Sequence, residues 1–165
     1  GYDTEFAGSF QCNDPFLNEL WKRSARTLYI TMRDNYMDCP ERERAQWWGD
    51  EVNELGEAFY ALSPSSHKLA VKGIYELMNW QRADGSLFAP VPAGNWSKEL
   101  PLQMLASVGW YGFYTQYYYS GDSTFMSACI VICMKHGRSI RVACPSNAVV
   151  NGVGVTGANR SIWGY

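Results

Sequence analysis

Apolar residues recur at helical spacing in four stretches of this chain, and no stretch of similar length alternates as a strand does. The first stretch opens with Asn13 and Asp14, either of which can cap a helix, and Pro15, which suits a first turn. Connections of short and long length alternate between the stretches. The pattern predicts an all-α protein of antiparallel helical hairpins, as in an α/α toroid. The expected helices cover residues 13–32, 50–62, 69–80 and 102–119.

Two irregular segments interrupt these helices, at residues 34–49 and 82–101. Long loops inside a compact domain are usually functional or disordered. The second segment contains Phe88 and Trp96, which favours an ordered, functional loop. The fourth helix is crowded with Trp, Tyr and Phe, which we expect to be core residues rather than platforms for sugars.

The composition of the chain argues against several classes of function. Charged residues make up 18% of the chain and its net charge is −2, so we expect no nucleic-acid partner. No apolar run is long enough to span a bilayer. The five cysteines have no paired C-x-x-C spacing, and His67 and His136 are isolated, so we expect neither a metal site nor a cofactor. The chain starts at Gly1 without a leader, as if cut from a longer protein, and its compartment stays unpredicted.

Residues 38–50 carry the strongest functional signal, with the sequence Asp-Cys-Pro-Glu-Arg-Glu-Arg-Ala-Gln-Trp-Trp-Gly-Asp. Four carboxylates, two guanidiniums and two indoles lie within thirteen residues. A site that protonates a glycosidic oxygen and holds a sugar ring needs these groups. The segment is therefore typical of a glycosidase active-site loop.

Structural roles are the alternative for the same residues. Asp50 can be the N-cap of the second helix, and the pair Asp38–Arg42 can be a surface ion pair of little consequence. Since Trp47 and Trp48 are adjacent, we expect one to face the core and the other a cleft.

The segment resembles the catalytic loop of the α-L-rhamnosidases, which reads Asp-Cys-Pro-x-Arg-x-Glu-Arg, two further residues, and Trp-x-Gly-Asp. This chain has one residue fewer before its Glu-Arg pair. Residues 100–107 and 119–122 also resemble helices of this superfamily, and the likeness covers residues 13–126. It implies part of an (α/α)6 toroid and inverting hydrolysis of terminal α-L-rhamnosides.

The resemblance also implies roles for individual residues. Glu43 is expected to be the general acid, Asp38 and Asp50 to accept hydrogen bonds from sugar hydroxyls, and Arg42 to orient a carboxylate or hydroxyl. The expected aromatic contacts to the sugar are Trp47 and, in the long loop, Trp96.

A general acid must hold its proton near neutral pH, so the pKa of Glu43 is expected to be raised by burial or by repulsion from Asp38 and Asp50. Arg42 and Arg44 would act in the opposite direction. The family's catalytic base lies far downstream, beyond the end of this chain. We therefore expect the chain to be a fragment that is inactive alone.

The composition changes near Met126. Residues 127–165 hold three of the five cysteines and almost no acidic residues, and within them the small-residue stretch 147–158 has neither a helical nor a strand pattern. From residue 153 the shifted reading frame permits Trp-Gly-Asp-Trp-Gly, so one interpretation is a tail translated out of frame. The other is an authentic β-like or disordered extension. We therefore divide the chain into a catalytic-domain fragment, residues 1–126, and an aberrant tail, residues 127–165.

Two other functions remain open. One is a six-hairpin glycosidase that acts on a different sugar. The other is a helical carbohydrate-binding or scaffolding module that performs no chemistry.

Overall fold

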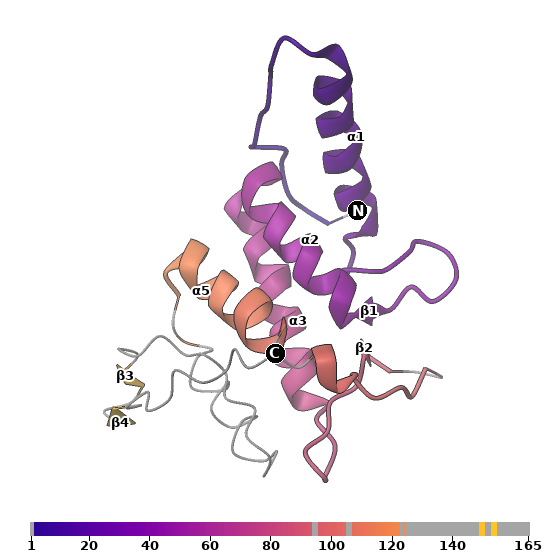
Figure 1. Cartoon of the computed structure of the whole chain (residues 1–165), viewed down its shortest axis with the longest axis vertical. Helices are drawn as coiled ribbons and strands as arrows, with labels where there is room; N and C mark the ends of the chain where they lie inside the picture. Colours follow the sequence, from indigo (N-terminus) through magenta and orange to yellow (C-terminus); the bar gives the residue numbers. More distant parts are fainter. Residues whose placement is uncertain are drawn as a thin grey trace.

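The computed structural model describes residues 2–93, 96–104, 107–122 and 124, together with the strand residues 149–150 and 153–154 (Figure 1). Helices dominate the described residues, and the predicted all-α class is confirmed. None of the helices in these residues has both the length and the apolar character needed to cross a membrane.

Helix α1 (Pro15–Thr31) begins where the sequence predicts. An Asp14 carboxylate oxygen accepts a hydrogen bond from the backbone N–H of Phe16 at 2.8 Å, and Pro15 occupies the first turn. The Asn18 side chain holds the preceding chain by two hydrogen bonds to the backbone of Cys12, both at 2.8 Å. Figure 1 shows that α1 and this preceding segment extend away from the other helices.

Helices α2 (Trp48–Ala61) and α3 (His67–Asn79) form a hairpin, joined by the short 3₁₀ turn η1 (Pro64–Ser66). The second helix starts two residues earlier than expected, with Trp47 at the N-cap position. The interpretation of Asp50 as an N-cap is therefore wrong. Its carboxylate lies in the first turn instead, where the helix dipole still favours a negative charge.

The expected fourth helix is interrupted. The described residues there form η2 (Leu102–Met104), the π-helical turn η3 (Val108–Tyr114) and helix α5 (Thr115–Ser120). The Trp48 indole occupies the space next to Gly112, where an added Cβ would lie 2.6 Å from the indole. The indole N–H donates to the Ser107 hydroxyl at 3.1 Å, which ties η3 to the start of α2.

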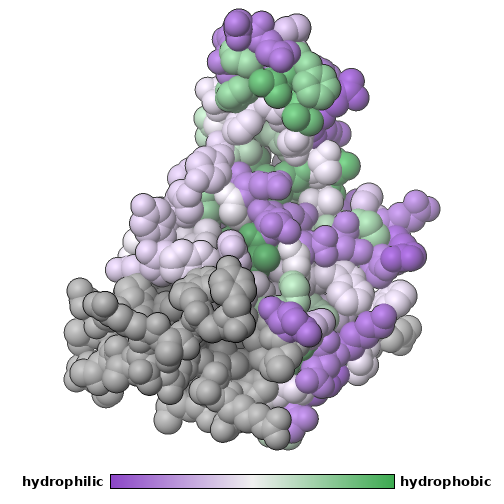
Figure 2. All heavy atoms as spheres, viewed as in Figure 1, coloured by the Kyte–Doolittle hydropathy of each residue, from purple (hydrophilic) through white to green (hydrophobic). Residues whose placement is uncertain are grey.

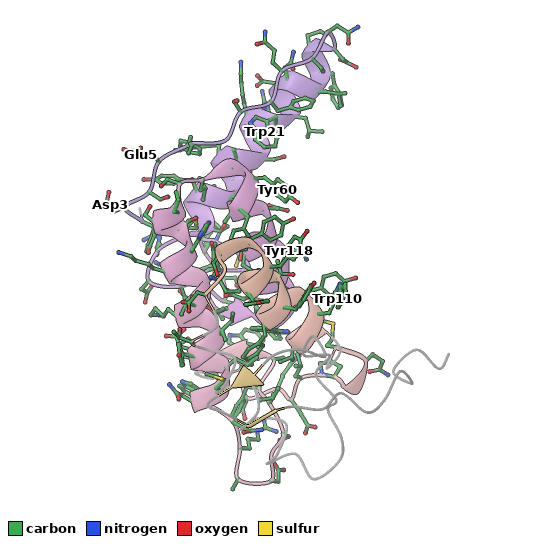
Figure 3. The ribbon with its side chains drawn as sticks, turned by 90° about the vertical axis from the view of Figure 1, so that its left-hand side faces the viewer. Asp3, Glu5, Trp21, Tyr60, Trp110 and Tyr118 are labelled. Atoms are coloured by element: carbon green, nitrogen blue, oxygen red, sulfur yellow. The ribbon has the colours of Figure 1, made fainter. Side chains whose placement is uncertain are left out.

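The aromatic residues of this region are only partly in the core. Phe113 is fully buried, but Trp110, Tyr111 and Tyr118 are 45%, 58% and 67% exposed. Figure 3 shows Trp110 and Tyr118 along one side of the molecule, with Tyr60 of α2 above them. Tyr119 is 42% exposed as well, so the expectation that these residues belong to the core is wrong for four of them.

Two very short strands contradict the absence of strands in the sequence pattern. β1 (Gln46–Trp47) pairs antiparallel with β2 (Pro90–Val91). The Trp48 N–H also donates to the carbonyl of Ala89 at 2.9 Å. These bonds bring the two irregular segments, 34–49 and 82–101, side by side.

The core has two parts. One surrounds Trp48 and includes Ile74 and Phe113, and the other lies where α1, α2 and α3 meet and includes Leu28 and Leu55. The far end of α1 lies outside both, and its surface is hydrophobic (Figure 2). The exposed large apolar residues there are Phe10, Phe16, Leu17 and Leu20.

The predicted tail, residues 127–165, and its boundary at residue 126 lie outside the described residues, except for four. These form β3 (Val149–Val150) and β4 (Val153–Gly154), which pair antiparallel. Whether the tail is out of frame or disordered stays a prediction.

Candidate active site

The motif loop, residues 38–45, is closed at its base by Asp38. The Asp38 N–H donates to the carbonyl of Ala45 at 3.1 Å, and an Asp38 carboxylate oxygen accepts from the Ala45 N–H at 3.1 Å. Arg44 has φ 49°, a left-handed conformation that turns the chain back toward Asp38. The loop geometry therefore depends on the same carboxylate that the sequence assigns to substrate binding.

Glu43 points inward from this loop. Its side chain is only 4% exposed and forms an ion pair with Arg42, whose own side chain is 80% exposed. The other Glu43 carboxylate oxygen accepts from the thiol of Cys39 at 3.2 Å. Asp38 lies close as well, since the ligand atoms of Asp38, Cys39 and Glu43 are all within 4.8 Å of one another.

The pKa of Glu43 does not follow the sequence expectation. The hydrogen bond from Arg42 is the main cause that lowers this pKa to about 2. Loss of solvent is the next largest effect and opposes it, and smaller contributions from hydrogen bonds with Cys39 and Asp38 lower the pKa further. Glu43 is therefore ionised at neutral pH in this arrangement. The expected raised pKa is wrong here, because the hydrogen bond from the guanidinium outweighs the loss of solvent, and the contact with Asp38 lowers the pKa instead of raising it.

A groove of about 460 Å³ lies between α1 and α2 and reaches the motif loop. Asp38 and Asp50, which are twelve positions apart in the sequence, both line it. Glu43 and Arg42 are not among its lining residues. The other polar residues of its wall are Arg23, Ser24, Thr27, Thr31, Asn53, Glu54 and Glu57.

The three carboxyl groups that α2 contributes to the groove have raised pKa values. For Asp50 the main cause is burial, followed by repulsion from Asp38. For Glu54 burial raises the pKa to about 8, and Asp50 and Asp38 add to the rise. Burial also raises the pKa of Glu57. Of these groups, Glu54 has a pKa high enough for the carboxyl to be mainly neutral near pH 7.

Sequence reasoning missed Glu54, Glu57 and the groove-lining residues of α1. One signal was present: Glu54 follows Asp50 by four positions, and such residues share a helix face. The contribution of α1 had no signal in the sequence, because it depends on how α1 packs against α2.

The two expected aromatic residues lie together. The rings of Trp47 and Trp96 meet edge to face, with centroids 6.3 Å apart. Trp47 is partly buried and Trp96 is 37% exposed. The pairing of β1 with β2 accounts for this contact, since it fixes the long loop beside the motif loop. Neither indole is among the residues that line the groove.

The cluster of Asp38, Cys39 and Glu43 offers three possible ligand atoms for a cation. Arg42 already supplies the positive charge that Glu43 needs, so we assign no metal to this cluster. The sequence likewise predicts no metal and no cofactor.

A comparison with known protein families matches residues 5–134 to the bacterial alpha-L-rhamnosidase 6 hairpin glycosidase domain. Neither curated proteins nor solved structures gave a match. The matched residues include the motif loop, all of α1, α2 and α3, and the residues that line the groove. The all-α hairpins are thus part of a six-hairpin toroid, and the chain belongs to the bacterial α-L-rhamnosidase six-hairpin glycosidase family.

Proposed function

We propose that the protein acts on terminal α-L-rhamnosides as an inverting glycoside hydrolase, with Glu43 as its general acid. The family is that of a glycosidase. The observation that carries the proposal is the shared groove: Asp38 and Asp50 both line it, and Glu43 lies within 4.8 Å of Asp38. Carboxylates on both sides of a groove can accept hydrogen bonds from the hydroxyls of one sugar ring.

Arg42 controls the acid in this proposal. While the guanidinium contacts Glu43, the carboxyl is ionised and cannot donate a proton. The Arg42 side chain is 80% exposed, so it is free to leave this ion pair and bind a sugar hydroxyl. Glu43 would then be a nearly buried carboxyl without its cation, and loss of solvent raises the pKa of such a group. Substrate binding would thereby produce the protonated acid.

In this proposal the other candidate site residues keep the roles that the sequence predicts for them. Asp38 and Asp50 accept hydrogen bonds from the sugar, and Trp47 with Trp96 packs against an apolar face of the substrate. An inverting enzyme also needs a carboxylate base far enough from the acid to admit water. We assign no base to the described residues.

Substrates with different leaving groups test the acid role directly. We expect Glu43→Gln to lower kcat/KM by roughly 10²–10⁴-fold on a rhamnoside with a sugar leaving group. On an aryl rhamnoside with an acidic phenol the loss should be much smaller, because such a phenolate departs without a proton. Glu41→Gln, an exposed neighbour in the same loop, is the matched control and should behave as wild type. Equal losses on both substrates would remove Glu43 from the acid role.

The alternative of a six-hairpin glycosidase for another sugar is tested on a panel of aryl glycosides. Turnover of a different glycoside, with none of the α-L-rhamnoside, would replace the substrate and leave the acid assignment in place.

One observation favours a second candidate function, a carbohydrate-binding module without chemistry. A carboxyl with a pKa of about 2 is suited to accept hydrogen bonds and not to donate a proton. Because we expect this chain to be inactive alone, the test uses the longer parent protein: sugar binding by that protein, without turnover of any aryl glycoside, would favour this function.

A further inference from the structure

Glu54 lies on the wall of the groove, one helical turn after Asp50 on α2. Its side chain is largely buried, and its Oε2 atom has no access to solvent and no hydrogen-bond partner among the described residues. An unpaired carboxyl oxygen in such a position is unfavourable, because the atom has lost water without gaining another partner. The Glu54 side chain lines the groove and the terminal torsion of a Glu side chain is broad, so rotation of the carboxyl can turn this oxygen toward a ligand there.

The proton of Glu54 decides which partner suits it. Burial raises its pKa to about 8, so the group is mainly a neutral carboxylic acid at pH 7. A neutral carboxylic acid donates one hydrogen bond, whereas an ionised one only accepts. Glu54 therefore differs from Asp38, whose carboxylate oxygen accepts a hydrogen bond from Ala45.

The charged and polar groups around Glu54 agree with this state. Acidic groups from both α2 and the motif loop disfavour its ionised form, and the Thr31 hydroxyl of α1 favours it. Arg23 of α1 also lines the groove, but it forms an ion pair with Glu19 at 2.8 Å. The titratable groups that face or surround Glu54 are Arg23, Tyr36, Asp38, Asp50, Glu51 and Glu57.

We infer that Glu54 is a sugar-binding residue, whose carboxylic acid hydroxyl donates a hydrogen bond to a hydroxyl oxygen of the sugar in the groove. The inference rests on the proposed function and adds a donor to the acceptors Asp38 and Asp50. A sugar hydroxyl both donates and accepts, so a wall with groups of both kinds can fix its orientation. Such a wall would select a polyhydroxylated ring over an apolar ligand.

A divalent cation is the other ligand that an acidic groove could attract. Cation binding needs several oxygen ligands that converge on one point. Among the described residues, Asp38, Cys39 and Glu43 are the only potential ligands that gather as a trio within 4.8 Å, and Glu54 is not one of them. A neutral acid is also a poor cation ligand, so the geometry favours the sugar.

Calorimetric titration of the full chain with L-rhamnose at pH 6, 7, 8 and 9 tests the inference. If only the neutral form of Glu54 binds, the association constant should fall roughly tenfold between pH 7 and pH 9, the loss expected across a pKa of about 8. Glu54→Gln keeps a donor and should bind within about threefold of wild type at pH 7, without the fall. Glu54→Leu should bind about tenfold more weakly at pH 7.

Glu5→Gln is the matched control, because Glu5 is exposed on the N-terminal segment (Figure 3) and should leave affinity and its pH profile unchanged. Near-ultraviolet circular dichroism checks that each variant is folded. A flat wild-type profile, or a fall that persists in Glu54→Gln, overturns the inference alone. Failure of wild type to bind L-rhamnose or any monosaccharide in a panel overturns both the inference and the proposed function.

A measurement on the carboxyl group itself is independent of affinity. Carbon-13 NMR of Glu54 should show its pKa rise further when the groove is saturated with L-rhamnose, because a sugar that accepts its proton stabilises the neutral form. An unchanged or lowered pKa would contradict donation by Glu54, even if Glu54→Leu binds weakly.

Discussion

In the motif loop, Glu43 lies against the guanidinium of Arg42 and its pKa falls to about 2, whereas burial on α2 raises the pKa of Glu54 to about 8. Both side chains are glutamates with little exposure, and both lie near Asp38. Burial alone therefore does not determine the protonation state. The difference depends on whether a cation contacts the carboxyl.

The different protonation states of Glu43 and Glu54 affect how the site is prepared to bind a substrate. An ionised carboxyl in the loop and a neutral one in the groove allow the two regions to make different hydrogen bonds at the same pH. In the loop, the exposed Arg42 pairs with Glu43 and can leave it, whereas the exposed arginine of the groove wall, Arg23, pairs with Glu19 and not with Glu54. The loop is thus the adjustable region, and the groove wall is fixed by helix packing.

The largest expected effect concerns the stability of the groove region. The pKa of Glu54 is raised in the folded protein, so its contribution is complete below its ordinary pKa and is lost as pH rises toward about 8. The loss should reach about 4 kcal/mol by pH 8. Glu54→Gln should remove this part of the pH dependence, measured as the difference from wild type in urea unfolding at pH 4.5, 6 and 8. For the control Glu5→Gln, the difference in unfolding free energy from wild type should not change with pH.

Glu51 also contributes to the pH dependence of stability. It is completely buried on the same helix, and its pKa is raised by burial and by Glu54. Its effect has the same sign and remains in the Glu54→Gln variant. If stability of that variant falls with pH as steeply as that of wild type, then Glu54 is ionised in the folded protein and the comparison fails.

The next largest effect should come from removing the cation of the motif loop. Arg42→Met should raise the pKa of Glu43 from about 2 to its ordinary value or above, because the strongest stabilising contact of the ionised form is lost. Carbon-13 NMR of the Glu43 carboxyl measures this change. Arg44→Met is the matched control, since Arg44 is not among the causes of the shift. A Glu43 pKa that stays near 2 would show that the loop backbone, and not Arg42, keeps Glu43 ionised.

Sequence reasoning found the helices of the hairpin but not the relation between these two regions. Asp14 and Pro15 mark the start of α1 because capping is local chemistry, readable within a few residues. The π-helical stretch η3 of the last helix includes Gly112, which lies against the Trp48 indole, a contact between positions far apart in the chain. Local patterns contain no information about such a contact.

In the candidate site, too, some features could be predicted from local sequence and others depend on contacts between distant positions. The motif placed Asp38 and Glu43 in one loop, and their proximity follows from the short separation. That Asp50 and Glu54 share a face of α2 could be predicted from helical periodicity alone. Glu54 was missed because it lies outside the motif. The contact of Trp47 with Trp96 depends on β1 and β2, strands too short to produce an alternating pattern.

A smaller effect should follow from the second partner of Glu43. Cys39→Ala removes the thiol that donates to the carboxylate at 3.2 Å, so the pKa of Glu43 should rise, but by less than in Arg42→Met. A thiol is a weaker donor than a guanidinium, and its hydrogen bond carries no charge. The same NMR titration ranks the two variants. A larger rise in Cys39→Ala would reverse the roles that we give to Arg42 and Cys39.

The smallest expected effect concerns the contribution of α1 to the pKa of Glu54 in the groove. The Thr31 hydroxyl is the only described group that lowers the pKa of Glu54, and it also donates to the carbonyl of Leu28 at 2.8 Å. Thr31→Val keeps the shape of the side chain and removes the hydroxyl, so the Glu54 pKa should rise slightly above its wild-type value. Thr27→Val is the matched control, because Thr27 lines the same groove but does not affect Glu54. A fall in the Glu54 pKa in Thr31→Val would mean that water enters the groove wall when the hydroxyl is lost, and that the burial of Glu54 depends on α1.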